Sequence, residues 1–223
     1  MKLVTFQSQD FVENLIHNKY IVCDDAKASK KIQRAYDWIS SKLSVYNSSD
    51  KESTYPIWCW VKCHNSICPP RVKGTPVPGF DFKITFNKDI PDILVIDYAR
   101  WSFVLNNQYI PKTKQDYVDF QKNLEMWGVT TEELRAYHRR DKYPTHRTDD
   151  IYRRACSAVH ASFDRCLSTF GGIQQGVFWK LYLTDVVSIE PLIDSNYRYG
   201  SLNYIRANGN RINWINTVIK ELV

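Results

Sequence analysis

The sequence predicts an α+β fold: a single compact domain with a mixed or antiparallel sheet flanked by helices. Segments with apolar residues at helical spacing and segments of alternating polarity both occur. They do not alternate strictly along the chain, which disfavours a doubly wound parallel sheet. The 223 residues suit one domain, and a hydrophobic fraction of 43% with 14% aromatic residues is enough for a core.

The first half of the chain carries most of the predicted strands. Residues 3–6 are typical of a short strand, and Ser8 is a typical N-cap for a helix that buries Phe11, Leu15 and Ile16. Apolar residues at helical spacing predict a second helix over 29–46. Further strands are predicted where β-branched and aromatic residues cluster or alternate with polar ones, at 55–61, 80–86 and 93–96.

The second half is predicted to be mainly helical. Helical spacing predicts helices at 100–107, 117–127 and 150–167. Gly128 stands where glycine commonly ends a helix, and Thr130 with Glu133 forms a capping box for a further short helix. The chain then predicts strands at 173–183 and 186–189, and a C-terminal helix from about residue 210. The residues that we expect in the helical core are Trp101, Leu105 and Trp127.

Positive charge is moderate overall and concentrated late in the chain. Thirty Lys and Arg against 24 Asp and Glu give a formal charge of +6. A basic stretch from Arg135 to Arg165, and basic groups interleaved with aromatic ones between residues 197 and 214, predict a surface that follows a phosphate backbone and stacks bases. We therefore expect a nucleotide- or nucleic-acid-binding protein; an ordinary solvated helix face is the other interpretation. The arginines expected on this surface are Arg135, Arg139, Arg140, Arg147, Arg153 and Arg154.

The cysteines and the N-terminal residues bear on the compartment. No apolar run approaches the ~20 residues of a membrane helix, and the N-terminal residues do not resemble a signal peptide. We expect a cytoplasmic protein with reduced cysteines and no membrane partner. Cys59, Cys63, His64 and Cys68 fall close together, but a second pair of zinc ligands is missing nearby, so no metal is predicted. Oligomeric state is left open.

Several short motifs together resemble a known family. They lie at 3–7, 55–60, 97–107, 162–165 and 175–179. They are similar to the bacterial and phage family named only as domain of unknown function 3841, over about residues 1–190. The Ser-Trp-Glu-Arg pattern of that family is Ser-Phe-Asp-Arg here. We therefore expect a family-like core over 1–190 and a C-terminal helical extension over 191–223, within a single domain 1–223.

The family has no established activity, so the resemblance directs attention to the polar residues of its motifs: Gln7, Arg71, Asp97, Asn106, Arg165 and Gln175. Burying such groups without partners costs free energy, so they are expected in networks or in a site. A short loop joins the helix of Arg165 to the strand of Gln175, and we expect these two side chains to share a site. The other interpretation is an ion pair between Arg165 and Asp97.

The layout suggests an alternative function by analogy: an ADP-ribosyltransferase-like enzyme, or a degenerate relative, with a pocket for NAD around Gln175. In such enzymes a late strand carries an acid that holds the ribose, and aromatic residues enclose the nicotinamide. Gln175 could hold the ribose but could not act as a base, so whether the protein is an enzyme stays open. The candidate catalytic residue is Gln175, and the candidate ligand-binding residues are Thr5, Gln7, Trp58, Trp60, Arg71, Asp97, Asn106, Arg165 and Trp179.

Overall fold

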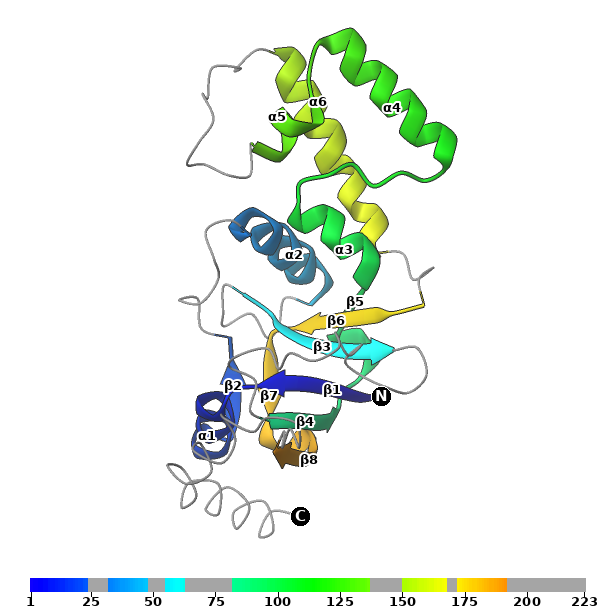
Figure 1. Cartoon of the computed structure of the whole chain (residues 1–223). Coiled ribbons are helices and arrows are strands. Elements are labelled where there is room, and N and C mark those ends of the chain that lie inside the picture. Colours follow the sequence, from blue (N-terminus) through cyan, green and yellow to red (C-terminus); the bar gives the residue numbers. More distant parts are fainter. Residues whose placement is uncertain (24–31, 48–54, 63–81, 137–149, 168–171, 192–223) are drawn as a thin grey trace, which may run out of the picture.

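The computed structural model describes residues 1–23, 32–47, 55–62, 82–136, 150–167 and 172–191 (Figure 1). The strands are β1 (Lys2–Gln7), β2 (Tyr20–Val22), β3 (Ile57–Lys62), β4 (Phe82–Asn87), β5 (Leu94–Asp97), β6 (Gln174–Phe178), β7 (Lys180–Tyr182) and β8 (Val186–Pro191). Six of them form one sheet in the order β5-β6-β3-β1-β4-β8, and every neighbouring pair is antiparallel. Strands β2 and β7 pair separately. The predicted α+β class is confirmed, with an antiparallel sheet.

The helices are α1 (Gln9–Asn18), α2 (Gln33–Tyr46), α3 (Tyr98–Leu105), α4 (Lys114–Trp127), α5 (Thr131–Ala136) and α6 (Asp150–Ser162). The same part of the chain holds the short 3₁₀ helices η3 (Ile90–Asp92), η4 (Phe163–Leu167) and η5 (Leu183–Asp185). None of the helices in the described ranges is long and apolar enough to cross a membrane.

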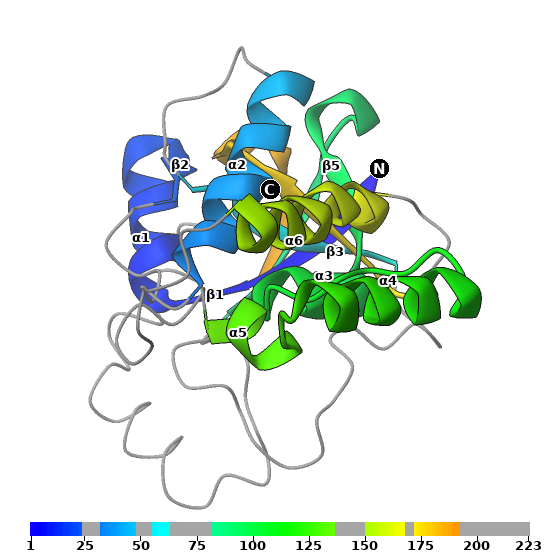
Figure 2. The same ribbon diagram turned by 90° about the horizontal axis from the view of Figure 1, so that it is seen from above.

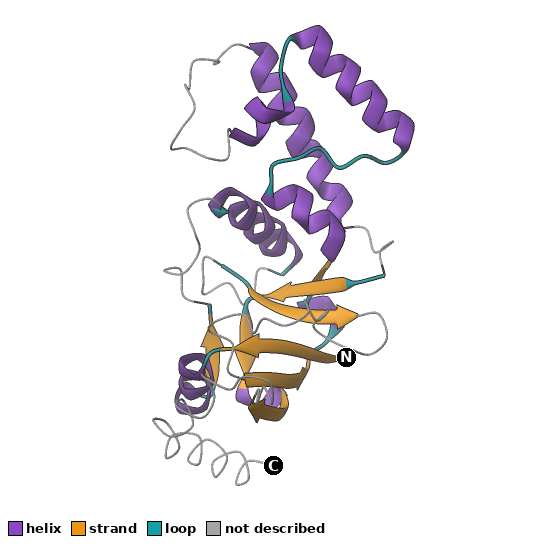
Figure 3. Cartoon of the chain, viewed as in Figure 1, coloured by secondary structure: helices purple, strands orange, loops and turns teal. Residues whose placement is uncertain are grey.

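The helices cover the sheet unequally (Figure 3). Helices α2 and α3 lie next to the β5-β6-β3 end of the sheet (Figures 1 and 2), and α4, α5 and the start of α6 lie farthest from β8 (Figure 1). Apolar residues of these helices form one core with Leu94, Ile96 and Val177 of the sheet. A second core joins α1 to residues such as Leu3 and Phe178. The sheet therefore separates two cores, and the helical layer extends well beyond the first.

The three predicted helix caps are confirmed, because each depends on residues only a few positions apart. Ser8 Oγ accepts from the Phe11 N–H at 3.3 Å and begins α1. Gly128 ends α4 with φ = 59°, in the left-handed region that glycine adopts readily. Thr130 and Glu133 form the expected capping box, with N–H···O distances of 2.7 and 3.1 Å.

The prediction of a single strand over residues 173–183 is wrong. Strand β6 ends at Phe178, and β7 begins at Lys180 in the other sheet, paired with β2. Trp179 lies at the break, is 1% exposed, and its Nε1–H donates to the Asn47 carbonyl at 2.9 Å. The switch between sheets depends on pairing with a strand that is distant in sequence.

The helix predicted to Leu167 also changes character near its end. Helix α6 stops at Ser162 and continues as η4. A 3₁₀ helix has about three residues per turn, so it keeps residues three apart on one face. Phe163 and Cys166, both buried, are three apart. The tighter winding therefore turns both side chains into the core.

Packing around the predicted core residues is uneven. Trp101 is 5% exposed, whereas Leu105 and Trp127 are half-buried against the same core. Gly176 allows Ile93 and Val61 to pack closely against β6, because a Cβ there would lie 2.6 Å from Ile93 Cγ2 and 2.9 Å from Val61 Cγ2. Some of the predicted features lie outside the described residues, namely Arg71, Arg139, Arg140, Arg147, Cys63, His64, Cys68 and residues 192–223.

Candidate nucleic-acid interface

The structure brings together two residues of the predicted nucleotide pocket, Trp60 and Gln175. They are register partners on β3 and β6 and therefore share a face of the sheet, where both are half-buried. The ring of Tyr98, at the start of α3, lies 5.2 Å from that of Trp60. Val4 of β1 is the other register partner of Trp60. Thr5 and Gln7 alternate with Val4, so they face the opposite side of the sheet.

Other candidates of that pocket have structural partners. Thr5 Oγ1 donates to the Trp58 carbonyl at 2.7 Å and accepts from Gln7 Nε2 at 2.8 Å. Asp97 is 4% exposed and caps α3, accepting from the Arg100 N–H at 3.0 Å. Asn106 Nδ2 donates to the Ser102 carbonyl at 2.7 Å.

Two candidate tryptophans belong to the cores rather than to an open surface. The Trp58 ring packs against Trp101, with centroids 4.8 Å apart, and against Tyr36 at 5.7 Å. Trp179 is buried at the β6–β7 break described above. Among the predicted pocket residues that the structure describes, only Trp60 and Gln175, with Tyr98 beside them, therefore share a partly exposed place.

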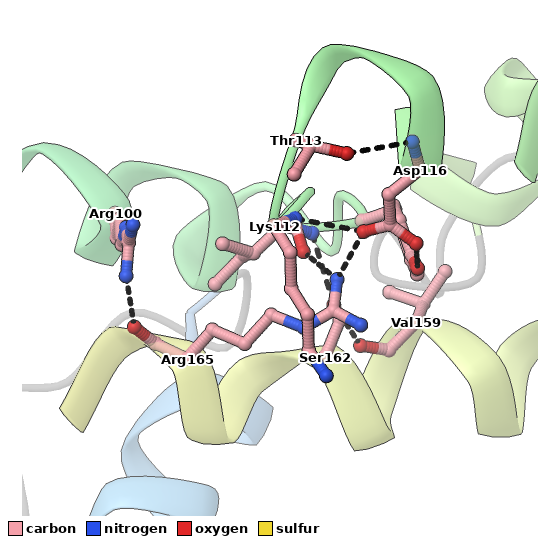
Figure 4. A network of polar contacts seen from close by, with 9 residues as sticks. Arg100, Lys112, Thr113, Asp116, Val159, Ser162 and Arg165 are labelled. Atoms are coloured by element: carbon pink, nitrogen blue, oxygen red, sulfur yellow. Dashed lines mark hydrogen bonds and ion pairs between the residues drawn. The ribbon is translucent and has the colours of Figure 1, made fainter. Parts of the chain in front are cut away.

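Arg165 lies in a polar network between η4 and the loop before α4 (Figure 4). Its guanidinium donates to Asp116 Oδ2 at 2.9 Å and to the Ile110 carbonyl, and lies 4.9 Å from the Tyr109 ring centroid. Asp116, rather than Asp97, is its ion-pair partner, so the Arg165–Asp97 interpretation is wrong. A shared Arg165–Gln175 site stays a prediction.

Ser162 also binds the loop before α4, through its hydroxyl group. Its Oγ accepts from the Ile110 N–H at 2.9 Å and donates to the Val159 carbonyl at 2.6 Å. Ser162 and Arg165 thus bind the N–H and the C=O of the same residue, Ile110. The first and last residues of the Ser-Phe-Asp-Arg motif therefore act as a clamp, which we call the Ile110 clamp.

The Asp116 carboxylate is stabilised in its charged form. The Lys112 N–H, 2.7 Å from Oδ2, is the main reason that the pKa of Asp116 is lowered. Burial opposes this effect, while the Tyr109 hydroxyl at 2.8 Å and Arg165 lower the pKa further. Burial raises the pKa of Tyr109, which keeps its hydroxyl protonated as the donor.

A pocket of about 90 Å³ opens between α3, α4 and α5, beside the Ile110 clamp. Four of its ten lining residues are aromatic and three carry a side-chain amide. The lining residues are Phe103, Asn107, Gln108, Tyr109, Tyr117, Phe120, Gln121, Thr131, Leu134 and Arg135. We refer to it as the Tyr109 pocket.

Ring stacking and hydrogen bonds hold the lining residues of the Tyr109 pocket in place. The Tyr109 ring is stacked on Phe120 with centroids 4.0 Å apart and planes 6° apart, and the Arg165 guanidinium also lies over it. Asn107 is 2% exposed, adopts φ = 50°, and donates from Nδ2 to the Leu134 carbonyl at 2.6 Å. These interactions fix the loop 107–110 against α4 and α5.

Three of the six arginines predicted to bind nucleic acid lie in the described residues, at the same end of the helical layer. The Gln108 amide oxygen, oriented towards Arg135, accepts from its Nε at 3.0 Å and also from its Nη2. Tyr152 donates to the Glu133 carbonyl at 3.1 Å, which joins the start of α6 to α5. Arg153 and Arg154 follow Tyr152 and are exposed.

The described cysteines behave as small apolar residues. Burial raises the pKa of both Cys59 and Cys166 to about 12, so these thiols are protonated at neutral pH. Within the described ranges no group of three or more His, Cys, Asp or Glu side chains could hold a metal ion.

The chain belongs to the family described as Domain of unknown function (DUF3841), whose family model matches residues 3–186. Comparisons with curated proteins and with solved structures give no match. Both the Ile110 clamp and the Tyr109 pocket lie inside the matched range, and Asn107 and Arg165 belong to the motifs that carry the resemblance. The sequence drew attention to Arg135 and Arg165 but gave no signal for the pocket between them.

Proposed function

We propose that the protein binds nucleic acid through the basic end of its helical layer. The observation that carries this proposal is the placement of Arg135 on the lining of a pocket, next to a helix start that presents Arg153 and Arg154. Arginine suits phosphate because its planar guanidinium can donate two parallel N–H bonds.

Arg135 is positioned but retains binding capacity. A guanidinium carries five N–H donors, and the Gln108 oxygen accepts two of those of Arg135. Immobilising a long side chain before the ligand arrives reduces the entropy that binding would otherwise cost.

The exposed ion pair of this surface does not block a phosphate. Arg153 Nη1 lies 3.5 Å from Asp150 Oδ1, with 69% and 95% of the two side chains exposed. Exposed pairs of this kind contribute about 0–1 kcal/mol and are screened by salt. A phosphate with its higher charge can therefore replace Asp150 as the partner of Arg153.

The test is the salt dependence of oligonucleotide binding. Replacing both Arg153 and Arg154 by alanine should weaken binding for all sequences. The slope of log K against log salt should fall by about 0.7 for each single-strand phosphate that the variant no longer neutralises. Fluorescence anisotropy with a labelled oligonucleotide measures both quantities.

A matched control is the double variant Lys2→Ala and Lys83→Ala, which removes the same charge from β1 and β4. We expect it to leave the slope unchanged. Equal losses of affinity in the two double variants would show that only net charge matters, and wild-type binding without salt dependence would refute the proposal.

A second candidate function rests on the pairing of Trp60 with Gln175 beside Tyr98. It is a nucleotide site of the NAD type at the sheet, in a degenerate relative of ADP-ribosyltransferases. The two candidate sites lie at opposite ends of α3, which begins at Tyr98 beside Trp60 and ends at Leu105, shortly before the loop of the Tyr109 pocket. Locating a bound ligand on the protein therefore distinguishes the two candidate functions.

A further inference from the structure

We infer that the Tyr109 pocket takes one unpaired base of the bound nucleic acid, so that the protein prefers single strands to duplexes; this rests on the proposed function. The volume of the pocket limits the size of the group that it can bind. The volume of the Tyr109 pocket is only about 90 Å³. Sites for whole small-molecule ligands are usually about 300–1,000 Å³. The pocket therefore suits one flat ring, with the sugar and phosphate outside.

The aromatic lining suits the face of a base. Tyr117 is 47% exposed on the first turns of α4, and Phe103 is half-buried on the opposite wall. Tyr109 and Phe120, already stacked on each other, close the interior. Bases stack on such rings largely regardless of sequence, because every base has a π-face.

The polar lining suits the edge of a base. Gln121 lines the pocket together with Gln108, whose amide oxygen binds Arg135, and an amide side chain can both donate and accept hydrogen bonds. In a duplex the edges of the bases are paired and their faces are stacked, so only an unpaired base offers both together. Arg135 on the same lining is placed to receive the phosphate of that nucleotide.

The Ile110 clamp gives this pocket a fixed shape. Arg165 lies over the Tyr109 ring, and Ser162 and Arg165 together bind Ile110, the next residue. Arg165 is thus a positioning residue: it acts on the base through Tyr109 rather than by touching it. This gives the Ser-Phe-Asp-Arg motif a role in binding as well as in folding.

The experiment compares single strands with duplexes. The probes are labelled oligo(U) and oligo(dT) of about ten nucleotides, within the usual length of a single-strand site, and a duplex of equal length. We expect tighter binding of the single strands. Tyr117→Ala should weaken that binding by about 5- to 100-fold, with little change for the duplex. Tyr117→Phe should restore binding because it keeps the ring.

Tyr46→Ala is the matched control, since Tyr46 on α2 is also 47% exposed. It should leave both affinities unchanged, and all three variants should melt near the wild-type temperature. Equal affinity for single strands and duplexes, with no effect of Tyr117→Ala, would refute the pocket while leaving the phosphate surface intact. Failure of every probe to bind would refute the proposed function itself.

Discussion

Replacing Trp101 by alanine should lower the free energy of unfolding by about 3–5 kcal/mol, the usual range for removing a buried tryptophan. Trp101 is 5% exposed and joins α3 to the sheet and to α2. Its ring centroid lies 4.8 Å from that of Trp58, 6.1 Å from Tyr36 and 6.5 Å from Trp38. Alanine would leave a cavity that these large, mutually packed rings cannot close.

Urea denaturation of Trp101→Ala measures this loss of stability. Trp127→Ala is the control, because Trp127 is half-buried on α4 and exposes part of its ring already. Trp127→Ala should lower the free energy of unfolding by clearly less than Trp101→Ala does. A loss below about 1 kcal/mol for Trp101→Ala, or equal losses for both variants, would contradict this packing.

Removing the arginine of the Ile110 clamp should have the second-largest effect. Arg165→Ala leaves the Asp116 carboxylate and the Ile110 carbonyl without this donor, and both are partly shielded from water. Loss of such charge-assisted bonds should lower the free energy of unfolding by about 2–3 kcal/mol. Arg165→Lys should recover only part of it, because an ammonium lacks the planar fork.

Lys42→Ala provides the comparison for Arg165→Ala. It removes a 2.5 Å ion pair with Asp164 of the same motif, but the two side chains are 33% and 58% exposed. We expect a loss of stability below about 1 kcal/mol there. Equal losses of stability in the two variants would contradict this account, because the Arg165–Asp116 pair would then contribute no more than an exposed ion pair.

Asp116 gives the clamp a pH dependence of known sign. Folding lowers the pKa of Asp116 below its usual 3.8. The stability that it contributes is therefore present above the unfolded pKa and is lost as pH falls through the folded one. The difference in stability between wild type and Asp116→Asn, measured by urea denaturation across the pH range, should be constant near neutral pH and shrink below about pH 4.

Local signals account for the parts of the fold that the sequence predicts. Helix caps such as Ser8, Gly128 and the Thr130–Glu133 box depend on residues a few positions apart, and these are confirmed. The division of 173–183 into β6 and β7 could not be predicted in this way. Residues typical of strands run through Trp179, with no Gly or Pro from Val177 to Leu183 to mark a break, and only pairing with β2 shows that the chain changes sheets.

The candidate interface was predictable only in part, for the same reason. Clustering of arginines is visible in the sequence, but the partner of Arg165 is 49 positions away at Asp116, and Asp97 was an equally plausible carboxylate. The pocket is formed by a loop and three helices, and no single segment shows a pattern for it. Which aromatic residues line it depends on how the Ile110 clamp holds that loop.

The most direct test of where nucleic acid binds is photo-cross-linking. An oligo(U) of about ten nucleotides, carrying 4-thiouridine, is irradiated with the wild-type protein, and the attached peptides are identified by mass spectrometry. Binding at the helical end predicts cross-links to peptides that contain Tyr109, Tyr117 or Arg135. Cross-links confined to Trp60 and Tyr98 at the sheet, or none above the level of a duplex control, would contradict it.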